Sequence, residues 1–219
     1  MEEQELINIW KAYDKKIEEA RVLNLQSWAL NLQSFGMIQT QKAKSKMDSL
    51  IRFKGRAVFI GLIYVLLLAV LIYGNHFANM YFTISLTMIL LITVYAILVY
   101  IKHIILIKQL KYDESITDTQ KKLSILQTST IYSTRIAWLQ MPFYCTWFWN
   151  TQWILHDITF WLIAFPITMA FTILTVWLYR NISYRNVNKK WFKILFNTPE
   201  WKSVRKATEF MCEIEDYIS

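Results

Sequence analysis

Residues 141–157, with the sequence MPFYCTWFWNTQWILHD, gather several side chains that could form a binding site. Six aromatic residues stand beside Cys145, His156 and Asp157. Together with His76, the last two supply two imidazoles and a carboxylate, which could bind a zinc or copper ion. Because these three residues lie in unrelated turns, we favour turn residues solvated by lipid headgroups, and we predict no metal and no cofactor.

The sequence contains none of the common catalytic motifs. We find no glycine-rich phosphate loop, no serine-centred elbow and no paired carboxylates facing a pocket. Cys145 is expected within a bilayer and Cys212 in the cytoplasm, so these two residues should neither form a disulfide nor share a metal. We therefore expect a protein that is not an enzyme.

Long segments without charge determine the expected fold class. Residues 57–101, 136–156 and 158–179 contain no Asp, Glu, Lys or Arg. A helix needs about 20 apolar residues to cross about 30 Å of hydrocarbon, so the first segment is long enough for two spans. The sequence GNHFAN at 74–79 interrupts that segment. We predict an all-α, polytopic membrane protein with four transmembrane helices in two hairpins and helices extending into the cytoplasm.

The expected organisation follows from these segments. The four spans are predicted at 57–74, 78–101, 136–155 and 158–179. The parts are a cytoplasmic amphipathic, coiled-coil-like helix with a basic juxtamembrane segment (1–56), a first transmembrane hairpin (57–101), a cytoplasmic helical loop (102–135), a second transmembrane hairpin (136–179) and a basic interfacial segment with a C-terminal helix (180–219).

The distribution of positive charge predicts the orientation. Of the 24 Lys and Arg residues, ten precede residue 57, six lie within 102–135 and eight follow residue 179. By the positive-inside rule, we predict a multi-pass protein of the cell (inner) membrane with both termini in the cytoplasm. The net charge of +8 then requires no nucleic acid. The basic segment 42–56 is expected to face an anionic inner leaflet, where each cation gains about 1 kcal/mol.

The N-terminal segment predicts a helix that needs a partner. Apolar residues recur between positions 6 and 35 at spacings of four and three, with a slip at Asn24. The partner could be the C-terminal helix, a second copy of the chain or a cytoplasmic protein, and the sequence leaves these alternatives open. The expected contact residues are Trp10, Tyr13, Ile17, Trp28 and Leu32.

Aromatic residues also predict contacts with the membrane. Trp147, Trp149 and Trp153 are expected at the outer interface, as an aromatic belt rather than a ligand cage. Trp191 lies in the basic segment 184–197, whose pattern suits a helix lying on the inner leaflet. Further along, Thr198 precedes Pro199 in the sequence TPEW, which predicts a capped helix start.

Four short stretches around the predicted spans carry a resemblance. They are IWKAYDKKIEEARVLN (9–24), DTQKKLSILQ (118–127), LQMPFYCTWFW (139–149) and ATEFMCEIEDYI (207–218). In this order they resemble a group of small, uncharacterised four-span membrane proteins of Bacteroidota. Some members of that group lie near sigma-factor genes, which implies a part in membrane-linked transcriptional regulation. The chain departs from the usual anti-sigma factor layout of one span and a large periplasmic sensor.

Two functions are compatible with this sequence. The first is a non-enzymatic interaction or regulatory protein of the inner membrane, whose cytoplasmic helices bind a partner or self-associate. The alternative is a homo-oligomeric channel or a membrane-permeabilising effector. That alternative is motivated by spans that lack ionisable groups but carry Ser and Thr residues.

Overall fold

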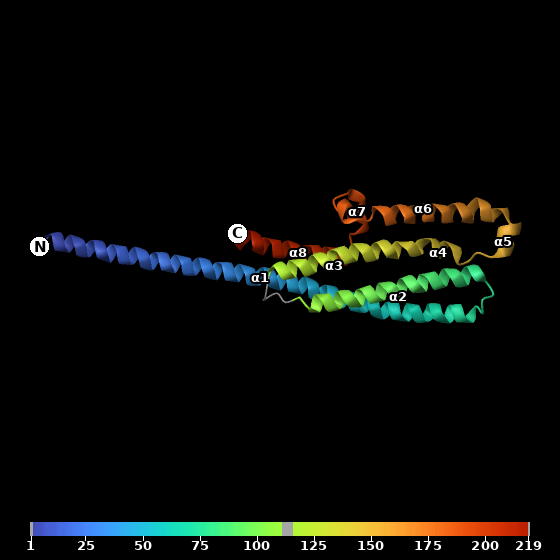
Figure 1. Cartoon of the computed structure of the whole chain (residues 1–219), viewed down its shortest axis with the longest axis horizontal. Coiled ribbons are helices and arrows are strands. Elements are labelled where there is room, and N and C mark those ends of the chain that lie inside the picture. Colours follow the sequence, from blue (N-terminus) through green and yellow to red (C-terminus); the bar gives the residue numbers. More distant parts are fainter. Residues whose placement is uncertain (1, 111–115, 219) are drawn as a thin grey trace.

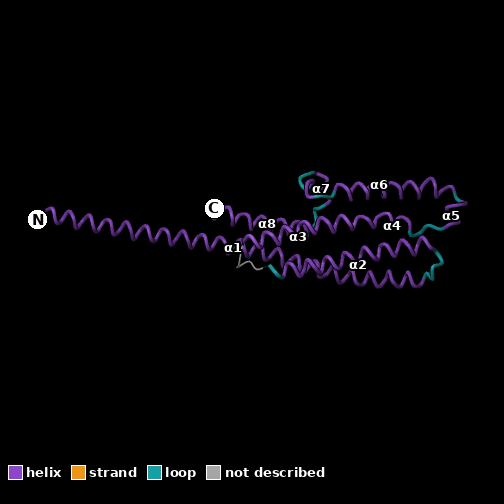
Figure 2. Tube along the Cα trace, viewed as in Figure 1, coloured by secondary structure: helices purple, strands orange, loops and turns teal. Residues whose placement is uncertain are grey.

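The computed structural model describes residues 2–110 and 116–218, without the side chains of residues 2–6, 9, 12, 116, 117, 211 and 214–218. Every regular element in this part of the chain is helical, as the purple segments of Figure 2 show. Three helical segments are long and apolar enough to cross a membrane: Tyr13–Gly74, Met80–Lys108 and Phe160–Asn181. The predicted all-α class is thus confirmed, and the long apolar helices are consistent with a membrane protein, whereas the arrangement of four spans stays a prediction.

The first two helices form a long hairpin. Helix α1 (Glu2–Gly74) runs without interruption for 73 residues, and its second half lies beside α2 (Met80–Lys108) (Figure 1). The chain reverses where His76 and Phe77 adopt positive φ angles of 44° and 60°. Asn79 then caps α2, because its side chain accepts a hydrogen bond from Phe82 N at 3.2 Å. The interruption predicted at 74–79 therefore coincides with this turn.

A second rod returns along the first hairpin. It consists of α3 (Ile116–Ala137), the 3₁₀ turn η1 (Trp138–Gln140) and α4 (Met141–Thr146), which follow one line in Figure 1. The change to 3₁₀ geometry directly precedes Pro142, which cannot donate the backbone hydrogen bond of an α-helix. Helix α5 (Thr151–His156), the π-helical turn η2 (Phe160–Ala164) and α6 (Phe165–Asn181) lead back.

The segment expected as the third span differs from the prediction. We expected one helix over 136–155, but α4 ends at Thr146 and α5 is a separate short helix. Asn150 separates them: its extended backbone starts α5, and its side chain accepts a hydrogen bond from Trp153 N at 2.7 Å. Apolar character alone could not locate this end, because the turn residues are themselves aromatic.

Beyond the charge-free segments, four helices share one core. The C-terminal helix α8 (Pro199–Ile218) lies along α1 and α3, and the end of α2 completes the bundle. Thr198 caps α8, accepting a hydrogen bond from Trp201 N at 3.3 Å, which confirms the predicted helix start. The buried core residues are Ala43, Met47, Leu50, Ile107, Leu110, Leu123, Leu126, Val204 and Ala207.

The basic segment 184–197 does not form the single surface helix that we predicted. It consists of η3 (Tyr184–Asn186), a turn and α7 (Lys190–Leu195), because Lys189 has an extended backbone. The aromatic rings of Phe192 and Phe196 stack at 4.1 Å between centroids and are buried. This segment closes a second core, formed by Ile131, Leu178, Ile182, Phe192, Phe196 and Trp201.

Gly61 sets the distance between α1 and α2. A Cβ atom at this position would lie 3.1 Å from both Cδ1 and Cγ1 of Ile97. Gly61→Leu should therefore force the two helices apart and lower the free energy of unfolding by about 1–3 kcal/mol. Thermal unfolding of the detergent-solubilised protein measures the effect.

The matched control is Gly55→Leu, since a Cβ atom at Gly55 would meet nothing within 4 Å. Both substitutions replace a helical glycine by a better helix former, so only the contact with Ile97 distinguishes them. Equal unfolding temperatures for the two variants would contradict the packing described here.

Candidate protein-binding surface on the N-terminal helix

The first part of α1 extends beyond the bundle. We call residues 2–34 the N-terminal arm; in Figure 1 it runs past the end of α8 with no other helix beside it. Among the described side chains, Gln39 marks a contact between α1 and α8: it is buried, and its Nε2 donates to Glu213 Oε2 at 2.7 Å. In the part of the chain that the structure describes, the outer part of the predicted contact stripe, from Trp10 to Trp28, is exposed, whereas Leu32 is half-buried.

The predicted contact residues lie on this arm. Trp10 is 68 % exposed, Ile17 60 % and Trp28 57 %, and Tyr13 is exposed to a similar degree. Leu32, nearer the bundle, is half-buried. Large apolar side chains on a soluble surface are normally covered by a partner when they form a continuous patch. The exposed stripe is thus a candidate site for another helix.

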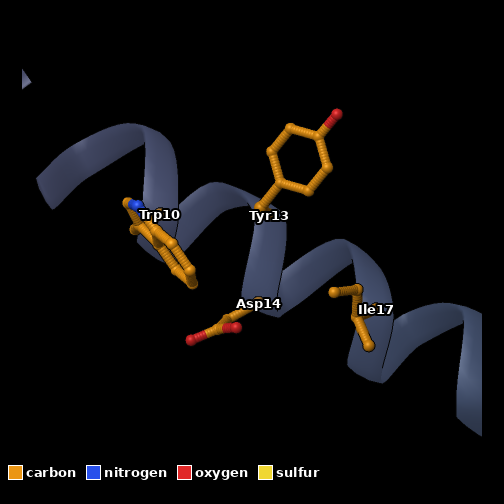
Figure 3. Close-up of a pocket in the computed structure, with 4 residues that line it drawn as sticks. All are labelled: Trp10, Tyr13, Asp14 and Ile17. Carbon is orange, nitrogen blue, oxygen red and sulfur yellow. The ribbon is translucent and has the colours of Figure 1, made fainter. Parts of the chain in front are cut away.

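Polar residues alternate with the apolar residues of this stripe. Figure 3 shows Trp10, Tyr13, Asp14 and Ile17 projecting from one helix, where they border an open hollow of about 400 Å³. A second hollow, of about 440 Å³, is bordered by Arg21, Asn24, Leu25 and Trp28.

The two hollows share one face of the arm. Positions 10, 14, 17, 21, 24 and 28 recur at alternating spacings of four and three, which places them along one side of a helix. Charged and amide groups therefore stand between the apolar anchors. A partner for this face would need matching polar groups as well as apolar ones.

As described, the turns that carry His76, His156 and Asp157 do not bring together the ligands of a metal site. Among the residues that the structure describes, no three His, Cys, Asp or Glu side chains lie close enough to hold a metal ion. Asp157 instead accepts hydrogen bonds from Thr159 N at 2.9 Å and Thr159 Oγ1 at 2.7 Å, which hold the pKa of Asp157 below its ordinary value. His76 lies beside Tyr73, with 5.6 Å between ring centroids, and His156 ends α5. The structure therefore gives the metal hypothesis no support.

The aromatic stretch joins the two hairpins. Trp147 lies 5.9 Å from Phe82 of the first hairpin, measured between ring centroids. Trp149 and Trp153 lie 5.0 Å and 5.5 Å from Phe160, at the start of the returning helix. The sequence did not reveal these partners. Placement of the three tryptophans at a membrane interface stays a prediction, as does that of Trp191, which lies 5.1 Å from Trp177.

Polar side chains within the apolar segments stabilise the helices. The hydroxyls of Thr87 and Thr93 donate to backbone carbonyls of their own helix at 2.7 Å and 2.8 Å. Ser85 Oγ and Thr146 Oγ1 share a hydrogen bond of 2.8 Å between the two hairpins. The Ser85–Thr146 bond is of the kind that packs helices in lipid, whereas the two threonine bonds satisfy the hydroxyls within their own helix. The channel alternative stays an untested prediction.

A buried ion pair lies where the apolar segments of the helices meet the four-helix core. Lys54 of α1 is fully buried, and its ammonium group pairs with the carboxylate of Glu200 at the start of α8. Lys54 Nζ also donates to His103 Nδ1 of α2 at 2.8 Å, so this nitrogen carries no proton. The other ring nitrogen, Nε2, then donates to Ser129 Oγ of α3 at 2.7 Å. The imidazole is therefore neutral.

Further contacts complete this polar junction, which we define as Lys54, Tyr100, His103, Ser129, Thr130 and Glu200. Tyr100 Oη donates to Glu200 Oε2 at 3.2 Å, and Thr130 Oγ1 donates to Glu200 Oε1 at 3.3 Å. Lys54 Nζ also lies 4.1 Å from the centroid of the Tyr100 ring. Glu200 thus accepts hydrogen bonds from three helices.

Sequence reasoning missed the polar junction. Lys54 belongs to a run of six cations and was assigned to the anionic leaflet, whereas the structure buries it. Its partner carboxylate lies 146 residues away, a separation that no local pattern encodes. The only signal was an acidic residue beside Pro199 in the first turn of a predicted helix, which usually indicates a favourable interaction with the helix dipole.

Removal of the Glu200 charge should destabilise the bundle. Glu200→Gln leaves the Lys54 ammonium group buried without its counter-ion, and such a change costs about 3–5 kcal/mol. We expect the unfolding temperature of the solubilised protein to fall by roughly 10 °C. The double variant Lys54→Met, Glu200→Gln removes both charges and should recover much of the loss.

Glu209→Gln is the matched control, since Glu209 is half exposed and pairs only with exposed Arg205 on the same helix. An exposed pair of this kind contributes at most about 1 kcal/mol. If the Glu200 and Glu209 variants unfolded at the same temperature, the ion pair would not have the structural role assigned to it.

Comparisons with protein-family models, curated proteins and solved structures find no match for this chain. The resemblance to membrane proteins of Bacteroidota, with its implied link to transcriptional regulation, therefore stays a prediction from the sequence. The function has to be argued from the geometry of the chain itself.

Proposed function

We propose that this chain is a non-enzymatic inner-membrane interaction protein with four spans, whose N-terminal arm binds a helical protein partner in the cytoplasm. The observation that carries the proposal is the exposed stripe of the arm, which includes Trp10, Ile17 and Trp28. Such side chains each contribute about 1.5–3 kcal/mol when a partner covers them fully.

The distribution of charge supports the membrane part of the proposal. The turns at 75–79 and 147–159 contain no Lys or Arg, whereas basic residues are frequent at the opposite end of the bundle. Three of the four proposed spans are the three long apolar helices. The fourth would be the apolar end of the α3–η1–α4 rod, up to Thr146. Both termini would then lie in the cytoplasm, beside the anionic inner leaflet.

The length of the arm suits contact with a cytoplasmic protein. At 1.5 Å per residue, 33 helical residues reach about 50 Å from the bundle. The helix continues without a break into the segment proposed to cross the membrane. A protein bound to the arm would therefore be held close to the membrane.

The charges on the stripe favour a different protein over an in-register second copy. Two copies in one membrane would present their arms in parallel, so Asp14 would face Asp14 and Arg21 would face Arg21. Like charges in such positions are unfavourable. A different helix can place a cation opposite Asp14 and a carboxylate opposite Arg21.

Affinity purification from native membranes tests this proposal. Trp10→Ser, Tyr13→Ser and Ile17→Ser together remove three apolar contacts, so the partner recovered with the full chain should fall by more than about tenfold. Quantitative mass spectrometry of the purified complexes measures this loss. A molar-mass measurement of the complex in detergent separates a second copy from a different protein.

The control combines Asn8→Ser, Lys15→Ser and Glu19→Ser, which alter the opposite face of the same helix and leave its net charge unchanged. The control should retain the partner. Recovery of the same proteins by a chain that lacks residues 2–34 would show that the arm is not the binding site.

A further inference from the structure

We propose that a basic hollow between α7 and α8 binds the phosphate group of an anionic phospholipid. The hollow has a volume of about 250 Å³. Four cationic side chains line it, and no acidic side chain is among the residues that do so. The residues that line the hollow include Lys193, Phe196, Trp201, Lys202, Arg205 and Lys206.

The cations converge from two helices. Arg205 and Lys206 follow Lys202 by three and four residues, so both lie on the same side of α8 as Lys202. Lys193 lies on α7. Arg205 Nε donates to Glu209 at 3.0 Å, one turn along the same helix. A guanidinium group has five N–H donors, so this contact occupies a minority of them.

The hollow has a fixed apolar base. Phe196 and Trp201 are both buried, with 5.5 Å between their ring centroids, and Phe192 packs against both. These contacts hold α7 against the start of α8, and so set the separation of the two cationic walls. Apolar side chains beside cations suit a phospholipid, whose phosphate is followed by an apolar glycerol ester region.

The hollow also lies where headgroups would be. The core that contains Phe196 and Trp201 includes Leu178 and Ile182, at the end of α6. Helix α6 contains the third apolar segment, so α7 is placed at the end of a proposed span (Figure 1). This step rests on the proposed membrane placement but not on the N-terminal arm.

The recognised chemistry is a phosphate group that accepts charge-assisted hydrogen bonds from Lys and Arg. Two kinds of ligand could supply this phosphate group: a phosphodiester headgroup of the inner leaflet or a soluble phosphate compound. We assign the lipid because the hollow combines cations with apolar side chains at the membrane end of the bundle. Both sources can be compared on one protein.

The test measures the unfolding temperature of the full chain in a neutral detergent as a function of added ligand. The probes are dioleoylphosphatidylglycerol, dioleoylphosphatidylcholine and inorganic phosphate. The variant is Lys202→Gln, Arg205→Gln, Lys206→Gln, and the matched control is Lys11→Gln, Lys15→Gln, Lys16→Gln, which removes three cations from the arm. If the triple variant is not folded in the absence of ligand, the single variant Lys202→Gln replaces it in the test.

Phosphatidylglycerol, but not phosphatidylcholine, should stabilise the wild type and the control. The apparent affinity should fall about fivefold for each cation removed from the hollow, so roughly a hundredfold in the triple variant. Equal stabilisation by inorganic phosphate would keep the phosphate site but overturn the lipid as its source. No stabilisation by any probe, or equal responses of variant and control, would overturn the site itself, whereas the arm proposal would stand.

Discussion

The high cost of placing charge in hydrocarbon is the constraint on which the rest of this structure depends. It explains why α2 and α6 can be long, apolar and largely exposed, with side chains such as Leu91 and Ile173 facing outward. It also requires that the helices satisfy their own polar groups. Thr87 and Thr93 do so by bonding to their own backbone, and Ser85 and Thr146 by bonding to each other across the two hairpins.

The same constraint applies where the apolar segments meet the four-helix core. Lys54 is fully buried there, so its charge is tolerated only because Glu200 and His103 contact it directly. This junction joins helices that enter the bundle from different parts of the chain. Because α1 is continuous, the arm, the junction and the first apolar segment form a single rod. The exposed stripe on the arm is thus rigidly connected to the bundle.

Local patterns in the sequence predicted what local physics determines. The charge-free segments located the turn before α2 and the combined extent of η2 and α6 (Phe160–Asn181) to within a few residues, and Thr198 with Pro199 predicted the start of α8. They did not predict contacts between distant segments. Glu200 and Lys54 meet across 146 residues, and the rings of Phe192 and Phe196 turn inward where a surface helix was expected. The end at Thr146 was missed because apolar content does not distinguish an aromatic turn from a helix. The exposed arm could be proposed from its spacing, but only the structure shows that its stripe from Trp10 to Trp28 is exposed.

We propose that the charge-free turns and the basic bundle lie on opposite sides of one membrane. Cysteine labelling of intact cells tests it most directly, with Cys145 and Cys212 replaced by serine. A membrane-impermeant maleimide should label the Phe77→Cys variant in intact cells, and the Lys189→Cys variant only after the membrane is permeabilised. Labelling of both variants in intact cells, or of the Lys189 variant alone, would contradict the account.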